Sequence, residues 1–399
     1  MTPAPEPHAP TSEDPQDHLL VSRWLNGASP WLDPAERVPY GHLISAAAAL
    51  RCAPADVVSR LAALGYHDVQ IPDGRLPASV AAEDAALVES VDSGRGSWVD
   101  VTVPVSLRQT VVLADRLQVS PAEVARRLTA LGYHYPAGSG PLPETRDARD
   151  LLLIRKDRKG YGAWLDQGEE VRAGHVLQVA AELKCGPHAA ALRLTALGVR
   201  LPYTPDPVDD RLLHTGAAGD EVHHHAAAWY PGHVLAVARE TGRRPADVLA
   251  RLQELGCWID PLSLPDAPEE DDFVILSEGL DGHSPWLRVN SVVGVQLRHV
   301  LRAALVTGRS PAETAERLAS LGHVLHENAR LPETADEEDV RLLETVDRSF
   351  KDGVHLEHVL RSAGLTGRSP ADVAERLSAL GYRLPDEVEY PEVRAVLRG

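Results

Sequence analysis

The side chains best suited to chemistry are histidines that stand twelve residues before a recurring proline. They are His42, His175, His233, His299 and His358. A catalytic or metal-binding histidine would need a partner that recurs with it, and none does. The second copy has Gln109 in this place, which forms hydrogen bonds but neither titrates near pH 7 nor readily binds zinc. We therefore expect a structural hydrogen bond at the start of a helix.

A separate histidine cluster is formed by His223, His224 and His225. Adjacent side chains point in different directions and do not make the i, i+4 pair of a helical zinc site. We expect a solvated loop here, and these three residues are the only candidates for metal. The cysteines Cys52, Cys185 and Cys257 are too far apart for a C-x-x-C site or a disulfide framework.

An arginine follows each anchor proline by six residues. The set is Arg60, Arg127, Arg193, Arg251, Arg317 and Arg376. On a recognition helix such an arginine could contact guanine or phosphate. In five copies an acid stands four residues earlier, namely Asp56, Glu123, Asp247, Glu313 and Asp372. This spacing favours an ion pair within one helix.

Enzyme signatures are missing from the sequence. It has no G-x-x-x-x-G-K-[ST], G-x-G-x-x-G, H-E-x-x-H, G-x-S-x-G or C-x-x-C motif. We expect no catalytic residue, no cofactor and no small-molecule substrate.

These residues are positioned by an internal repeat. The segment 307–322, TGRSPAETAERLASLG, returns at 366–381 as TGRSPADVAERLSALG, identical at 12 of 16 positions. Four weaker copies precede them, and in all six a Leu-Gly pair begins ten residues after the anchor proline. The anchors are Pro54, Pro121, Pro187, Pro245, Pro311 and Pro370.

Each anchor segment has the marks of a helix at both ends. Ser120, Ser310 and Ser369 stand where an N-cap belongs, with proline at the first helical position and an acid at the third. The glycine suits the end of the helix because it adopts positive φ readily. Apolar residues at i, i+4 and i+7 predict one buried face.

Further elements precede and follow this helix. A second helix is expected just upstream, as in AGHVLQVAAEL from Ala173, and a first helix in stretches such as 334–347, with Thr334 and Glu337 suited to a capping box. Short strands are expected at the recurrent tryptophans and just past the Leu-Gly pair, as at 199–202 and 382–385. The tryptophans are Trp31, Trp98, Trp164 and Trp286. We interpret them as packing elements, with an exposed partner-binding residue as the alternative.

The order helix, strand, helix, turn, helix, strand is that of a winged helix-turn-helix. The motifs LL, a D-G turn, PWL, GHVL, SPAEVAxRLxxLG and YRLP resemble tandem winged-helix-like repeats of actinobacterial multidomain proteins, including ones linked to Hsp90-like ATPases and conflict systems. The resemblance covers 17–386 and implies an α+β, mainly helical fold of six tandem winged-helix-like repeats of about 60–67 residues. The fourth copy has His-rich sequence in place of the Trp region, and the sixth lacks the Trp.

The repeats give a domain plan for the whole chain. We expect a disordered Pro-rich tail over 1–17 and repeats over 18–77, 78–143, 144–206, 207–265, 266–332 and 333–399.

Charge bears on the class of partner. The 399 residues carry a formal charge of −18, and the six anchor helices together sum to −1, which works against binding a polyanion. With no apolar span and no signal peptide, a cytoplasmic protein is expected. Arginine outnumbers lysine 36 to 4, as in the high-GC genomes of actinobacteria. The sequence thus favours a non-enzymatic scaffold or adaptor for protein–protein interaction in a bacterial conflict or signalling system, with a multi-winged-helix nucleic-acid-binding transcriptional regulator as the alternative.

Overall fold

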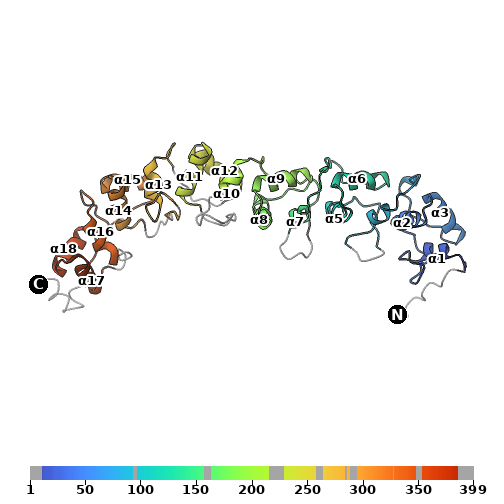
Figure 1. Ribbon diagram of the computed structural model, residues 1–399, viewed down its shortest axis with the longest axis horizontal. Coiled ribbons are helices and arrows are strands. Elements are labelled where there is room, and N and C mark those ends of the chain that lie inside the picture. Colours follow the sequence, from blue (N-terminus) through green and yellow to red (C-terminus); the bar gives the residue numbers. More distant parts are fainter. Residues whose placement is uncertain are drawn as a thin grey trace. The chain divides into compact units, whose positions relative to one another are not determined.

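The computed structural model describes residues 11–92, 97–156, 163–214, 229–257, 264–283, 285–287, 294–326, 328–346 and 353–384. The chain divides into two compact units, Met1–Pro205 and Asp206–Gly399. Each unit holds three copies of a three-helix repeat (Figure 1). None of the helices that the structure describes is long and apolar enough to cross a membrane.

The third helix of every repeat begins at the anchor proline. These helices are α3 (Pro54–Ala63), α6 (Pro121–Ala130), α9 (Pro187–Ala196), α12 (Pro245–Glu254), α15 (Pro311–Ser320) and α18 (Pro370–Ala379). Ser120, Ser310 and Ser369 accept the backbone N–H three residues on, as the sequence predicts. The glycine that follows each helix has φ between 76° and 94°. All six anchor helices are therefore confirmed.

A tight turn joins the second helix of each repeat to the third. These helices are α2 (Tyr40–Leu50), α5 (Leu107–Leu117), α8 (Ala173–Leu183), α11 (Pro231–Thr241), α14 (Leu297–Thr307) and α17 (Leu356–Thr366). Each ends in a left-handed residue that turns the chain into the third helix.

The first helix of each repeat is short. These helices are α1 (Pro15–Val21), α4 (Asp84–Leu87), α7 (Asp150–Leu153), α10 (Val208–His214), α13 (Glu270–Leu276) and α16 (Glu337–Leu342). Two 3-10 turns, η1 (Pro72–Gly74) and η2 (Leu343–Thr345), lie in the connections. The capping box expected at Thr334 is wrong, because Asp336 caps α16 through the N–H of Glu338.

The first repeat begins earlier than the expected tail over 1–17 allows. Asp14 caps α1 through the N–H of Gln16, and the helix starts at Pro15. Asp17 is buried against the third helix of the same repeat. Residues 15–17 are thus part of the fold, and the first ten residues lie outside the described part of the chain.

The expected strands are reduced to single bridges in the described residues. Antiparallel bridges join the end of the first helix to the tryptophan: Ser22–Trp31, Glu89–Trp98, Arg155–Trp164 and Ser277–Trp286. Parallel bridges join the segment before the second helix to the one after the third: Val38–Val69, Glu170–Arg200 and Val295–Leu325. The mainly helical part of the α+β prediction is therefore confirmed, and the winged part is only partly visible, because the pairings between described residues are single bridges and form no sheet.

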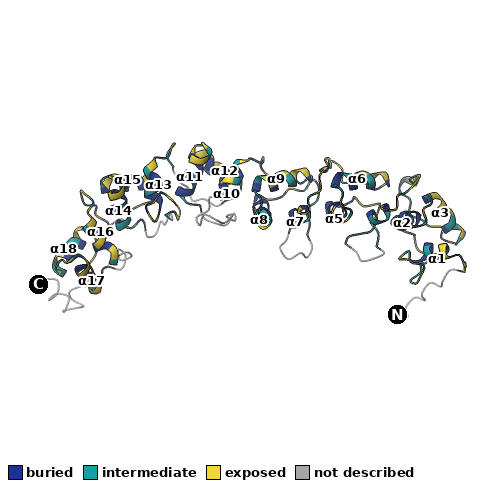
Figure 2. Ribbon diagram, in the orientation of Figure 1, coloured by how far each residue is buried: buried dark blue, intermediate teal, exposed yellow. Residues whose placement is uncertain are grey.

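The apolar core runs from repeat to repeat within each unit. In the first unit one cluster joins Leu20 and Leu61 of the first repeat to Leu87 and Leu128 of the second. In the second unit Leu297 and Leu301 of α14 pack into the core of the last repeat. The second helix of one repeat packs on the first helix of the next, as α2 on α4 and α14 on α16. The buried faces of these helices are the dark blue ones in Figure 2.

Candidate functional site

The arginine six residues after the anchor proline lies on the third helix. In a winged helix-turn-helix that binds DNA, this helix would be the recognition helix. In all six repeats this arginine instead bonds an aspartate of the first helix. The pairs are Arg60–Asp17, Arg127–Asp84, Arg193–Asp150, Arg251–Asp209, Arg317–Asp272 and Arg376–Asp339. In the last four the guanidinium uses Nε and Nη2 on the two carboxylate oxygens, at 2.5–2.8 Å. This fork geometry fixes the third helix on the first.

The ion pair predicted within the third helix is wrong. Asp247 binds Arg244, three residues before it, instead of Arg251. Glu313 closes a capping box on Ser310. An acid in the first turn interacts with groups at the start of its own helix, where the helix dipole is positive. The arginine side chain instead points toward the first helix. The structural interpretation of the arginine holds, but its partner lies elsewhere in the repeat.

The most buried of these pairs is Arg251–Asp209, with side-chain exposures of 8% and 1%. Burial works to lower the pKa of Arg251, but the hydrogen bonds that it donates to Asp209 and Glu254 outweigh burial and raise that pKa. In the third repeat burial raises the pKa of Asp150 although Arg193 opposes it. In all six pairs the aspartate is buried, so that a ligand cannot separate the pair without leaving a buried carboxylate unpaired.

In three repeats the recurrent histidine forms the structural hydrogen bond that the sequence predicts, with an acceptor in the last turn of the first helix. In the last repeat His358 instead accepts the His355 N–H. His42, His175 and His299 bond through Nε2 to the carbonyls of Leu20, Leu153 and Ile275, at 2.7–2.8 Å. Burial lowers the pKa of all three, for His42 to about 4. A neutral, bonded imidazole of this kind is a poor candidate for catalysis.

Two repeats make related hydrogen bonds with other side chains. The Gln109 amide donates to the Glu89 carbonyl at 2.8 Å, and its oxygen accepts the Val91 N–H at 3.0 Å. In the last repeat the Ser362 hydroxyl donates to Leu342 at 2.9 Å. In four repeats the acceptor is thus the carbonyl three residues after the paired aspartate, and in the second repeat it is Glu89, two residues further on.

The recurrent tryptophans lie at the contacts between consecutive repeats. The Trp98 side chain covers Gly41 of the preceding repeat, and its ring meets His42 edge-on with centroids 5.9 Å apart. Trp286 covers Gly232 in the same way. The Trp164 ring of the third repeat lies under Arg108 of α5 in the second repeat, 4.7 Å away, a cation–π contact.

The residue before the histidine position therefore differs according to whether the next repeat has a tryptophan to pack against it. Glycine makes room for a tryptophan at Gly41 and Gly232, and Arg108 stacks on one. Arg298 faces the last repeat, which has no such tryptophan, and forms an ion pair with Glu344 at 2.9 Å. Trp98, Trp164 and Trp286 therefore pack at the junctions between consecutive repeats.

Gly232→Ala should loosen the junction between the fourth and fifth repeats by about 1–3 kcal/mol, the usual cost of overpacking. A Cβ at this position would overlap the Trp286 ring. The measurement is amide hydrogen exchange of α11 and α13, read by mass spectrometry.

Gly364→Ala in α17 is the matched control for this change. A Cβ there meets no atom within 4 Å, so alanine should stabilise the helix by up to about 1 kcal/mol. If Gly232→Ala leaves exchange in α11 and α13 unchanged, Trp286 does not pack on α11 as the structure has it.

The other candidate residues have simpler surroundings. Trp31 is half-buried, with its ring edge-on to His18. Trp24 has 47% of its surface exposed and was not singled out from the sequence. His223, His224 and His225 lie outside the described residues, and within the described ranges no group of three His, Cys, Asp or Glu side chains could hold a metal.

The repeat is recognised by a family model. It matches residues 12–66, 79–133, 145–199, 204–257, 267–323 and 334–382, and its description is wHTH-Hsp90_Na associated. The chain belongs to the wHTH-Hsp90_Na-associated family. No curated protein and no solved structure matches it.

Within this wHTH-Hsp90_Na-associated chain, the outward side of the third helix is acidic and small. Its exposed charged residues are seven acids and one arginine: Asp56, Asp247, Glu254, Glu313, Glu316, Asp372, Glu375 and Arg126. Most other exposed positions are Ala, Ser or Thr. Figure 2 shows the exposed side of α12 and α15. The arrangement can support close packing against another surface but offers few groups that bind phosphate.

Sequence reasoning missed the aspartates that hold the arginines. A signal for them exists: in each repeat the aspartate stands three residues before a Leu or Ile that is followed by another apolar residue, as in Asp17-His-Leu-Leu-Val. The pairs are separated by 37 to 45 residues, so helical spacing alone does not find them.

Proposed function

We propose that this protein is a non-enzymatic scaffold whose wHTH-type repeats bind protein rather than nucleic acid. The observation that carries the proposal is the internal ion pair of the third-helix arginine, found in all six repeats. An arginine that is already neutralised by a buried aspartate contributes little to phosphate binding, because counterion release depends on free cationic side chains.

The composition of the outward face supports a protein partner. Alanine, serine and threonine allow another backbone to approach closely, and the scattered acids favour a partner with basic groups at the rim of the contact. The chain as a whole carries −18, which adds to the repulsion of a polyanion.

Repetition supplies the second part of the proposal. Each compact unit presents three related faces, so one chain can engage a repeated or extended partner. Linked weak contacts then give an avidity well above the affinity of any single face. We place this scaffold in the cytoplasm of an actinobacterium, in a conflict or signalling system.

Duplex DNA should bind weakly, without sequence preference, and be released at about 150 mM salt, where its charge is screened within about 8 Å. The measurement is an electrophoretic mobility shift of the full chain against a random-sequence duplex library. Selection of a discrete sequence with submicromolar affinity, lost on Arg126→Ala at the exposed arginine of α6, would instead assign the protein as a regulator.

The positive test uses partner capture with variants of the outward face. Ala130, Ala196 and Ala319 are exposed near the ends of α6, α9 and α15. Changing all three to Arg should remove partners that the tagged wild-type chain retains from its native host. Ala49→Arg, an exposed change on α2, is the control and should retain them. Equal retention by both variants would count against the third helices as the binding face.

A further inference from the structure

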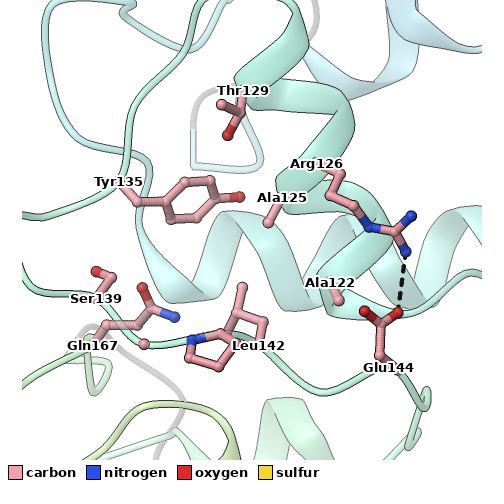
Figure 3. A pocket seen from close by; sticks show the side chains of 11 residues that line it. Ala122, Ala125, Arg126, Thr129, Tyr135, Ser139, Leu142, Glu144 and Gln167 are labelled. Atoms are coloured by element: carbon pink, nitrogen blue, oxygen red, sulfur yellow. Dashed lines mark hydrogen bonds and ion pairs between the residues drawn. The ribbon is translucent and has the colours of Figure 1, made fainter.

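A cavity of about 500 Å³ lies beside α6 in the second repeat. Ala122, Ala125 and Thr129 of α6 line one side, and the loop after the helix lines the other (Figure 3). Its volume is within the range of ligand pockets, about 300–1,000 Å³. Gln167, from the third repeat, closes the base, so the cavity is formed by two consecutive repeats.

Gln167 is the unusual group in this cavity. It is 92% buried, since 8% of its surface is exposed, and within the described part of the chain neither Oε1 nor Nε2 has a hydrogen-bond partner. The buried Ser139 hydroxyl, beside Gln167 in Figure 3, also has no partner there. An unpaired buried amide costs free energy, about 1–3 kcal/mol by protein mutational data. A ligand that supplies both a donor and an acceptor would remove that cost.

The equivalent position in the second repeat shows that the amide is not needed for packing. Gln167 stands three residues after Trp164, and Val101 stands three residues after Trp98. Val101 is 3% exposed and belongs to the apolar core. The repeat therefore folds with valine here, and the glutamine is a departure that the core does not require.

The walls of the cavity carry no free charge. Arg126 bonds Glu144 and Glu123, both at 3.1 Å. The Tyr135 hydroxyl shares a hydrogen bond with Thr110 at 3.0 Å, and burial raises the pKa of this tyrosine to about 12, so it stays neutral. A phosphate or carboxylate would find no unpaired cation in this cavity. The site suits a neutral ligand.

We propose that the cavity between α6 and Gln167 binds a neutral peptide segment of a partner protein. One peptide group of the segment pairs its N–H and C=O with Oε1 and Nε2 of Gln167, and a neighbouring aliphatic side chain packs on Ala122, Ala125 and Leu142. This site rests on the proposed function, since it gives the protein-binding scaffold one specific anchoring point.

The experiment selects a displayed library of linear heptapeptides on the full chain, with counter-selection on Gln167→Val. Enriched peptides are then synthesised with capped ends and titrated by calorimetry. We expect neutral peptides with an aliphatic residue, whose Kd rises about tenfold on Gln167→Val through loss of the paired amide. Ala125→Phe, which fills the cavity, should abolish binding, and Ala49→Phe, exposed on α2 and outside the cavity, should not.

A second readout separates a binding role for Gln167 from a structural one. Gln167→Val should raise the Tm of the free chain, because valine removes an unsatisfied amide. A fall in Tm, no enriched peptide, or peptides that bind Gln167→Val equally well would each overturn the proposal, and so would enrichment of charged sequences. Partner capture by Gln167→Val and Ala125→Phe distinguishes failure of the cavity proposal from failure of the scaffold proposal. If both variants retain all partners, the cavity proposal is wrong and the scaffold function stands.

Discussion

Asp209→Asn is expected to lower the free energy of local unfolding around α12 by about 3 kcal/mol. The change leaves the Arg251 guanidinium, 8% exposed, without the carboxylate that neutralises it. Breaking a buried pair typically costs about 3–5 kcal/mol, and the lower end applies because Glu254 still bonds Arg251 at 2.6 Å. Hydrogen exchange of α10 and α12, followed by mass spectrometry, measures the effect.

The control lies on the same helix. Asp247 is the acid that helical spacing would assign to Arg251, but it bonds the exposed Arg244 instead. Asp247→Asn should leave exchange in α12 almost unchanged, because exposed pairs contribute little. Equal effects of the two changes would mean that Arg251 pairs within its own helix. Replacing Asp209 and Arg251 together by leucine should recover most of the loss, since no buried charge then remains unpaired.

These two aspartates also show how far the sequence predicts this fold. The anchor helices follow from local signals: a capping serine, proline at the first position, an apolar stripe and a terminal glycine. Such signals act over a few residues and can be read from the chain directly. The partner of the arginine is a tertiary fact, because 37 to 45 residues separate the two side chains. Several acids in each repeat compete for that assignment.

The tryptophan segments show a different limit. Their aromatic and apolar residues predict strands, and the pairing partners are where a wing requires them, as in the Glu89–Trp98 bridge. The described segments nevertheless pair at one residue only, in the first repeat as well as in those where the tryptophan packs on the preceding repeat. The short pairing is therefore common to repeats with and without such a contact.

The candidate site divides in the same way. The low net charge of the third helices could be read from the sequence, which needs no coordinates. The cavity at Gln167 could not be predicted, because it depends on two repeats meeting and on which polar atoms remain unpaired. Aligning the repeats does show that Gln167 stands where the second repeat has the core residue Val101. That difference is the sequence signal for the cavity.

Lowering the pH from 7 to 5 should destabilise the first repeat, and His42→Gln should remove much of that sensitivity. His42 donates from Nε2 to Leu20 at 2.7 Å, and its buried Nδ1 has no partner among the described residues. Burial lowers its pKa from 6.5 to about 4. Between these values the unfolded chain takes up a proton that the folded chain refuses, so stability is present above about pH 6.5 and falls as the pH drops toward 4.

The size of this effect follows from the two pKa values. At pH 5 the unfolded form gains about 2 kcal/mol relative to pH 7 from this one histidine. The glutamine of His42→Gln can donate to a backbone carbonyl, as Gln109 does to Glu89 in the second repeat, but has no proton to gain. Wild type and variant should therefore have similar exchange in α2 at pH 7 and differ by about 2 kcal/mol at pH 5. The carboxylates are common to both chains and cancel in the comparison. Identical pH dependence of the two chains would mean that His42 titrates near its ordinary pKa, and the buried hydrogen bond to the end of α1 would then be wrong.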